Sequence, residues 1–319
     1  MKDSSRSSPP PTLPFFPSLR RYLPSATVIL LLFSLGYIAG LLSSPSSPSS
    51  VNPQLQSHIR DSNCSFSPPH DLFRFHTDCA KPIPHDRVLP TLLNRLFNNT
   101  SPYSDFPSPE TATLLLPPAA HPRGWGSTKP VFSDLISTIR PLTIIELGTF
   151  LGASALHMAS LTRNLSLPNS LIICLDDFRG WPAFRSRFGR HVPIPHHADS
   201  LLLHQFMLGV SAAGETHRIL PVPFSTSSGL AALCEWGIYG DLIEVDAGHD
   251  FHSAWSDINM AYAVLRPGGV LFGHDYYTAA DDHGVRRAVT LFSRAKGLKV
   301  RPHGEHWVLS PKPVDSVPV

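Results

Sequence analysis

The sequence carries few charges and no block of one sign. Asp, Glu, Lys and Arg make up 16% of the 319 residues, and 26 basic side chains against 24 acidic ones leave a net charge of +2. A nucleic-acid-binding surface needs a concentrated basic patch, so this composition gives no indication of one. The 17 histidines add positive charge only below neutral pH.

Cysteine is scarce, with four residues and no Cys-X-X-Cys spacing. A zinc site built from thiolates is therefore not expected. Cys64 and Cys79 lie near each other in the sequence and could pair in an oxidising compartment. Cys174 falls in an expected buried strand and Cys234 in an expected helix, which favours a role as small core residues for both.

Long apolar runs are rare too. One, SATVILLLFSLGYIAGLL at Ser25 to Leu42, contains no charge over 18 residues. As a helix rising about 1.5 Å per residue it would span roughly 27 Å, close to the thickness of a thin bilayer. The alternatives are a cleaved signal peptide, whose apolar stretch is usually shorter, and an organelle transit peptide, which is usually amphipathic. The sequence favours a transmembrane signal anchor.

Basic residues flank this run mainly on one side. Arg60 is the first Lys or Arg after it, whereas four precede it: Lys2, Arg6, Arg20 and Arg21. The positive-inside rule therefore predicts a cytosolic Ser/Pro-rich tail at 1–24 and a lumenal main domain. We expect a single-pass type II membrane protein of the Golgi or ER, with a stem or linker at 43–109 and the folded domain at 110–319. Asn-X-Ser/Thr triplets that could carry glycans in a lumen begin at Asn63, Asn98, Asn99 and Asn164.

Beyond Gly124, strand-like and helix-like patterns alternate. Strands are expected at 143–147, 171–176, 219–224, 241–246, 270–274, 298–301 and 306–309, with helices between the first six. Apolar runs without alternation indicate strands that are covered on both faces. The last two are separated only by PHGE, which is too short for a helical crossover, so they should form an antiparallel hairpin. The sequence predicts a doubly wound, mostly parallel, seven-stranded α/β sheet of the Rossmann-like kind.

The segment ELGTFLGAS, residues 146–154, follows the first expected strand. Ligands of open α/β sheets bind beyond the carboxyl ends of the strands, and Gly148 and Gly152 leave the backbone open to close approach. Glu146 disfavours a phosphate, which prefers amide donors, and favours a ligand with positive charge and hydroxyl groups. S-adenosyl-L-methionine (S-adenosylmethionine below) is such a ligand, and Asp176 after the second strand is placed to accept both ribose hydroxyls.

On these residues, the chain from about Gly124 to Leu309 resembles class I S-adenosylmethionine-dependent methyltransferases. ELGTFLGAS is similar to the motif of metal-dependent small-molecule O-methyltransferases, and VDAGHDF with LRPGGVLFGHDYY resembles the branch containing macrocin O-methyltransferase and cephalosporin-hydroxylase-like proteins. The resemblance implies six cofactor-binding residues: Glu146, Gly148, Gly152, Ser154, Asp176 and Ser225. The first three would line the methionine part, Ser154 would contact its carboxylate, Asp176 would hold the ribose, and Ser225 would approach the adenine.

A second group of polar residues follows the fourth and fifth strands. Asp246, His274 and Asp275 should converge beside the sulfonium, and an oxygen-rich set of this kind favours Mg²⁺ or Mn²⁺. Such an ion lowers the pKa of an acceptor hydroxyl. His249 is the candidate general base, with Asp246 as its catalytic partner. Metal-dependent relatives carry a carboxylate or asparagine beside the second aspartate, where this chain has His274 and Tyr276, so a metal-free site is the alternative.

Two loops have less specific patterns. RGWGSTKP, residues 123–130, is expected to fold over the cofactor. The Arg-, His- and aromatic-rich insertion at 179–197 either forms a lid for an acidic or sugar-containing acceptor or is a solvated loop.

The sequence therefore favours an enzyme, an S-adenosylmethionine-dependent methyltransferase acting on a hydroxyl or carboxyl oxygen of a glycan or small molecule in the secretory pathway. One alternative is a lumenal nucleotide-sugar glycosyltransferase, although its usual Asp-X-Asp motif is missing. Another is a catalytically inactive methyltransferase-fold binding protein, which the presence of Glu146 and Asp176 disfavours. No nucleic-acid partner is expected, and the sequence predicts no particular oligomeric state.

Overall fold

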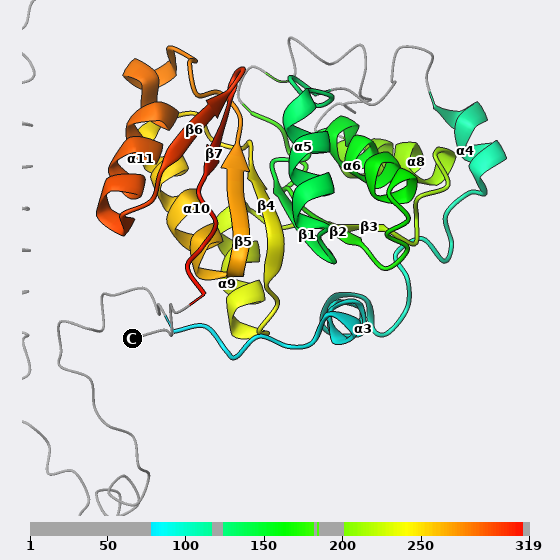
Figure 1. Ribbon diagram of the computed structural model, residues 1–319. Helices are drawn as coiled ribbons and strands as arrows, with labels where there is room; N and C mark the ends of the chain where they lie inside the picture. The colour runs from blue at the N-terminus through cyan, green and yellow to red at the C-terminus, as the bar shows by residue number, and fades with distance from the viewer. Residues whose placement is uncertain (1–77, 117–123, 182–183, 185–200, 315–319) are drawn as a thin grey trace, which may run out of the picture. The chain divides into compact units, whose positions relative to one another are not determined.

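The computed structural model describes residues 78–116, 124–181, 184 and 201–314 (Figure 1). The expected tail and anchor, 1–24 and 25–42, lie outside these residues, as does the first part of the expected stem. Among the residues that are described, no helix combines the length and apolar character needed to cross a membrane.

Seven strands form one sheet in the order β3-β2-β1-β4-β5-β7-β6. Their bounds are β1 Thr143–Leu147, β2 Leu171–Leu175, β3 Ile219–Val222, β4 Gly240–Val245, β5 Leu265–Gly273, β6 Val300–His303 and β7 His306–Leu309. The first five are parallel, and β7 runs antiparallel to both β5 and β6. The predicted seven-stranded, mostly parallel sheet and its closing hairpin are confirmed. β5 begins five positions earlier than expected, at Leu265 rather than Val270.

Helices cover both faces of the sheet, as Figure 1 shows. One apolar cluster joins the sheet to α5 Pro130–Ile139, α6 Ala153–Asn164 and α8 Leu202–Ala212. The other joins it to α3 His85–Phe97, α9 Thr226–Glu235, α10 Phe251–Ala263 and α11 Ala280–Lys296. Neighbouring residues of one strand serve opposite clusters, since Ile144 packs in the first and Ile145 in the second. This explains why the strands lack a polar face in the sequence.

Several helices begin and end with recognisable signals. α5 has Pro130 at its first turn, where the missing N–H leaves no donor unsatisfied. Ser225 caps α9 and Asp250 caps α10, each accepting a hydrogen bond from a backbone N–H of the first turn. α11 ends at Gly297, whose φ of 66° is the left-handed conformation common after a helix. The two caps place the starts of α9 and α10 directly after β3 and β4.

Residues 78–109, assigned to a stem by the sequence, contain ordered structure that packs on the sheet unit. α3 buries Val88 and Leu92, four residues apart on one helical face, in the cluster with α9 and α10. α4 Pro109–Leu115 follows, and Pro107 before it accepts a hydrogen bond from Ser211 of α8 at 2.6 Å. The Pro-rich composition hid these helices, because α3 contains Pro90 in its interior and α4 begins at a proline.

The arm before α3 is tied to the loop after α9 by a disulfide between Cys79 and Cys234. Ala80 N also donates to Cys234 O, and Ile83 N to Gly237 O, each at 2.9 Å. The expected pairing of Cys79 with Cys64 is therefore wrong, and Cys234 is in a helix as expected but is not a free core residue. The partner lies 155 residues away in sequence, beyond the reach of a spacing argument. Cys174 is a free, buried cysteine in β2, as predicted.

Candidate active site

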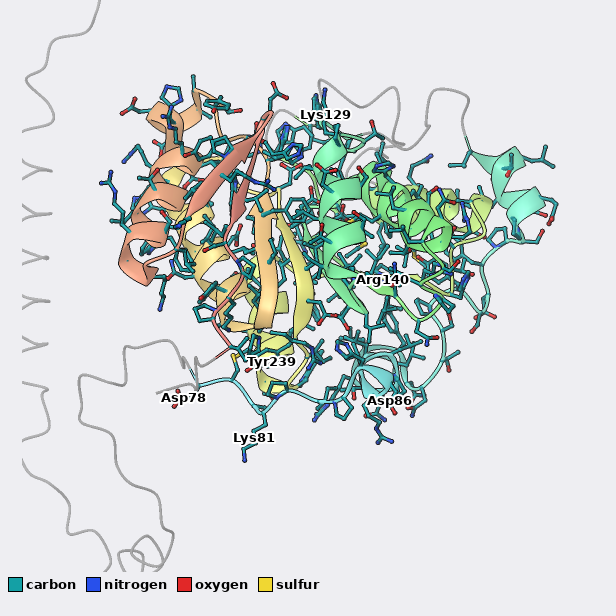
Figure 2. The ribbon with its side chains drawn as sticks, viewed as in Figure 1. Asp78, Lys81, Asp86, Lys129, Arg140 and Tyr239 are labelled. Carbon is teal, nitrogen blue, oxygen red and sulfur yellow. A yellow bond between two sulfur atoms is a disulfide. The ribbon has the colours of Figure 1, made fainter. Side chains whose placement is uncertain are left out.

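A cavity of about 1120 Å³ opens at the carboxyl ends of the parallel strands. The loops after β1 to β5 line it, together with the segment before α5 and the turn between β6 and β7. Figure 2 shows Lys129, one of the lining residues, at this end of the sheet and Tyr239 at the opposite end. Pockets for a single small ligand usually occupy about 300–1,000 Å³, so this one has room for a cofactor and an acceptor together.

Gly148 and Gly152, which follow β1, have different structural roles. Both have positive φ, 84° at Gly148 and 80° at Gly152. A Cβ on Gly148 would lie 2.0 Å from the backbone oxygen of Asp246, so this glycine lets the β1 and β4 turns touch. A Cβ on Gly152 would lie 2.7 Å from the ring of Phe206 in α8. Gly148 lines the cavity as predicted, whereas Gly152 is a packing residue between α6 and α8.

Glu146 lies beneath the cavity rather than in its wall. It is fully buried, its Oε2 accepts a 2.8 Å hydrogen bond from Thr149, and its Oε1 accepts one from Ser154. Burial raises the pKa of Glu146 to about 7, although these two hydroxyl groups act in the opposite direction. Thr149 and Ser154 line the cavity, so the carboxylate positions two residues that a ligand can reach.

Asp176 lines the cavity where the sequence places it, and it also organises the neighbouring turns. Its Oδ2 accepts from Phe150 N at 2.8 Å and its Oδ1 from Phe178 N at 2.7 Å. Both phenylalanines have left-handed backbones, with φ of 52° and 53°, a conformation that is uncommon for aromatic residues. Burial raises the pKa of Asp176 while these backbone donors lower it. Each oxygen retains a lone pair for a ligand hydroxyl.

Ser225 lines the cavity from the start of α9, as predicted. Its neighbour Thr226 also lines the cavity and was missed by the sequence analysis. Thr226 Oγ1 donates to the buried carboxylate of Asp257 in α10 at 2.7 Å, and burial raises the pKa of Asp257 to about 6. Asp177 and Glu305 are further lining residues that were missed. The adjacency of Asp177 to Asp176 was the one available signal, because the position of Glu305 depends on the hairpin turn.

Asp246, His249 and Asp275 bring one ligand atom each to within 4.8 Å of one another. His249 Nε2 lies 2.9 Å from Asp275 Oδ2 and 4.0 Å from Asp246 Oδ1. Its hydrogen bond to Asp275 raises the pKa of His249. Burial raises the pKa of Asp246 to about 6, although the two nearby histidines lower it. Although burial alone would raise the pKa of Asp275, its contacts with the two histidines and with Thr278 hold it well below the ordinary range.

His274 lines the cavity and lies near both aspartates, as predicted, with its Nδ1 3.8 Å from Asp246 Oδ1. Its ring lies against the ring of His306, with centroids 4.6 Å apart, and Gly126 packs against its Nε2 and Cδ2 atoms. Nδ1 is 3.3 Å from Asp275 Oδ2 and Nε2 is 3.6 Å from Glu305 Oε2. Strand alternation accounts for this placement, because His274 shares the face of Phe272 toward α5. In the described residues the group whose ligand atoms all lie within 4.8 Å of one another is Asp246, His249 and Asp275, so His249 is a candidate ligand beside the predicted His274.

The segment before α5 closes one side of the cavity, in line with the expectation for RGWGSTKP. A Cβ on Gly126 would lie 2.6 Å from His274 Nε2, so the backbone passes directly over that ring. Trp125 stacks on Phe150, with ring centroids 5.7 Å apart, and contacts Trp181 at 6.3 Å. The insertion at 179–197 lies largely outside the described residues, which include only its first three residues and Phe184.

Comparison with known proteins agrees with this geometry. Residues 145–276, the span from β1 to the end of β5, match the family described as "Methyltransferase domain". The match covers this segment of the chain and is therefore a likeness of the segment to a methyltransferase domain. The expected resemblance to S-adenosylmethionine-dependent methyltransferases is confirmed, and with it the expected class of enzyme. The narrower resemblance to the macrocin O-methyltransferase branch stays a prediction.

Similar solved structures include an O-methyltransferase from Bacillus cereus in complex with SAH, with 14% identity and a TM-score of 0.46, covering 72% of this chain and 100% of that one. An O-methyltransferase of tomaymycin synthesis from Streptomyces achromogenes, in complex with SAM, has 15% identity and a TM-score of 0.43, covering 72% and 99%. No curated protein sequence matches this chain significantly.

Proposed function

We propose that this protein transfers the methyl group of S-adenosylmethionine to an oxygen of a hydroxyl or carboxyl acceptor, a glycan or a small molecule, in the secretory pathway. The observation that carries the proposal is that Gly148, Ser154, Asp176 and Ser225 reach the same cavity as Asp246, His249 and Asp275. The first four come from the β1, β2 and β3 side of the sheet, and the last three from β4 and β5. We assign the first four residues to a cofactor half of the cavity and the last three to an acceptor half.

The residues of the cofactor half suit S-adenosylmethionine chemically. Asp176 offers carboxylate lone pairs to ribose hydroxyls, and Ser154 and Thr149 offer hydroxyl groups to the methionine end. Glu146 fixes both hydroxyl groups from below and adds negative charge near an ammonium or sulfonium. When bound, the cofactor supplies an electrophilic methyl group. The protein must then align the acceptor oxygen with that methyl group and exclude water.

A divalent ion fits the acceptor half. Two carboxylates and one imidazole, from Asp246, Asp275 and His249, form a donor set that Mn²⁺ or Mg²⁺ accepts when water completes the shell. Such an ion would lower the pKa of an acceptor hydroxyl and orient it. If no ion binds, His249 is the residue placed to take the hydroxyl proton, with Asp275 holding its ring at 2.9 Å. The two roles of His249 exclude each other, because a ligating nitrogen cannot also accept a proton.

We further propose that the domain lies in the lumen of the Golgi or ER, as a single-pass type II membrane protein anchored by residues 25–42. The basic residues before the apolar run and their absence directly after it support this orientation. The disulfide between Cys79 and Cys234 supports it independently, because disulfides persist in oxidising compartments and are rare in the cytosol.

The test of the activity is calorimetry on the full-length protein, titrated with S-adenosylmethionine and separately with UDP-sugars, each with and without Mg²⁺. We expect S-adenosylmethionine to bind and UDP-sugars not to bind. The full chain is required, because a fragment starting at residue 110 would lack α3 and Cys79. Binding of a UDP-sugar alone would replace the proposal by glycosyl transfer, and binding of S-adenosylmethionine without turnover on any acceptor would favour an inactive binding protein.

A further inference from the structure

The acceptor half of the cavity has a distinctive composition. From the loops after β4 and β5 and the turn before β7 it receives the side chains of Asp246, His249, His274, Asp275, Thr278 and Glu305. The remaining contributors on this side are Ala247, Gly248 and one aromatic residue, Tyr277. A phenolic ring needs an apolar slot on both faces, and these loops do not form one. A ligand rich in hydroxyl groups can instead donate to carboxylate and imidazole acceptors throughout this surface.

The charge of the cavity wall argues against an acidic acceptor. Five carboxylates line the cavity, at Asp176, Asp177, Asp246, Asp275 and Glu305. Among the described lining residues Lys129 is the one Lys or Arg that faces them. The positive charge of a bound cofactor and of one divalent ion would offset most of this negative charge without reversing it. A uronate, phosphate or sulfate group would thus meet more carboxylates than basic side chains, since the described lining residues include only Lys129, His249 and His274 as basic groups.

Tyr277 provides a surface on which a ring can stack. The residue is 51% exposed although it lies on the cavity wall, and the loop after β5 carries it. Tyr276 contacts it edge-on at 5.2 Å, and the Arg286 guanidinium lies 5.7 Å from its ring centroid. These contacts hold the ring in place and still leave half of the residue accessible. Aromatic side chains of this kind bind the C–H face of a pyranose while the hydroxyl groups at its edge meet polar partners.

We infer that the acceptor is a neutral saccharide, which binds with a ring face on Tyr277 and its hydroxyl groups toward Asp275 and Glu305. This inference rests on the proposed methyl transfer and specifies its substrate class. In the reaction, the saccharide oxygen forms a bond to the methyl carbon, and the carbon–sulfur bond of the sulfonium breaks with its electron pair left on sulfur. The hydroxyl proton passes to a base in the cavity wall or to water, so the product is a sugar methyl ether.

The experiment uses the full-length protein with methyl-labelled S-adenosylmethionine and three groups of acceptors. These are neutral gluco-, galacto-, manno- and xylo-oligosaccharides, oligogalacturonides, and catechol as a phenolic probe. We expect a neutral oligosaccharide to have a kcat/KM at least about tenfold above the best member of either other group. A preference for oligogalacturonide or catechol overturns the inference, and so does binding of S-adenosylmethionine without methylation of any neutral oligosaccharide. Failure to bind S-adenosylmethionine refutes the proposed function itself.

Three variants at two residues, Tyr277 and Glu305, test the side chains that carry the inference. Tyr277→Ala should raise the KM for the oligosaccharide roughly fivefold with little change in the affinity for S-adenosylmethionine, and Tyr277→Phe should retain the normal KM. Glu305→Lys should shift the preference toward oligogalacturonides by about tenfold. The lysine places a positive charge on the cavity wall, where it can pair with a uronate carboxylate. Leu291→Ala is the control, because Leu291 is 48% exposed on α11 and does not line the cavity. An unchanged KM in Tyr277→Ala would contradict the stacking role.

Discussion

The carboxylate of Glu146 and the hydroxyl of Thr149 form a 2.8 Å hydrogen bond beneath the cavity. An acid whose pKa rises on folding, here to about 7 from an ordinary 4.5, binds a proton more tightly in the folded state. The contribution of Glu146 to the free energy of unfolding is therefore most favourable below pH 4.5. It decreases as the pH rises from 4.5 to about 7 and does not change further above pH 7.

Glu146→Gln should remove this dependence. Relative to the wild-type protein, the variant should gain up to about 3 kcal/mol in the free energy of unfolding as the pH rises from 4.5 to 8. Urea unfolding across this range measures it, with Glu235→Gln at the exposed end of α9 as control. If the free energy of unfolding had the same pH dependence in Glu146→Gln and in the wild-type protein, ionisation of Glu146 would not destabilise the folded state.

Gly148→Ala should destabilise the protein by at least about 3 kcal/mol. The added Cβ would meet the backbone oxygen of Asp246 at 2.0 Å, and the residue would keep a φ of 84°. Gly297→Ala is the matched control, since Gly297 has a φ of 66° but nothing within 4 Å of the added atom, and it should cost about 1 kcal/mol. Thermal and urea unfolding give both values. Equal losses would mean that the β1 and β4 turns can separate without penalty.

The ligand set of the acceptor half can be decided by Mn²⁺ titration monitored by electron paramagnetic resonance. His249→Ala should weaken Mn²⁺ binding by at least about tenfold, because it removes a donor from the group with Asp246 and Asp275. His274→Ala should have the smaller effect, since His274 packs on His306. His303→Ala serves as control, because His303 pairs with Asp134. A larger loss for His274→Ala would restore the ligand set that the sequence predicts.

Removal of the disulfide should lower the free energy of unfolding by about 2–5 kcal/mol. Cys79→Ser and Cys234→Ser should have similar effects singly, and the double variant should lose no more than either, because each change breaks the same bond. Urea unfolding of the variants and of the normal protein with and without reductant gives the comparison. A single variant as stable as the wild-type protein would show that the disulfide does not stabilise the fold.

A lumenal domain should carry glycans at exposed triplets. Asn98, Asn99 and Asn164 are all exposed, the first two directly after α3 and the third at the end of α6. Protein from membranes should lose mass on treatment with an N-glycosidase, and replacement of all three asparagines by Gln should reduce that loss. A glycan-free chain whose domain is cut by protease added outside sealed vesicles would place it in the cytosol.

The fold followed from local patterns, and so did the location of the site. Apolar runs such as 143–147 identify strands covered on both faces, and the short PHGE link requires a hairpin, so the sheet is largely determined before any contact is known. The site lies at the strand ends, and polar residues there, such as Asp176 and Asp246, are recognisable by position alone.

The contacts that the sequence did not predict all involve partners distant in sequence. Gly152 faces Phe206, and Cys79 meets Cys234, neither of which has a local signal. The contact of His249 with Asp275, which the sequence did not predict, has a similar origin. Strand alternation directs His274 toward α5, while the loop after β4 turns His249 back over Asp275. The identity of a residue predicts what it can bind, but its neighbours in space decide whether it does.

The turn that presents Glu305 joins the edge strand β6 to β7, and a backbone hydrogen bond from Tyr276 N to Glu305 O connects it to the end of β5. The parallel strands that carry Gly148 and Asp176 lie on the other side of the sheet order and do not depend on it. A change in the length or charge of this turn, by natural divergence or by protein engineering, can therefore alter the choice of acceptor. The residues of the cofactor half stay the same.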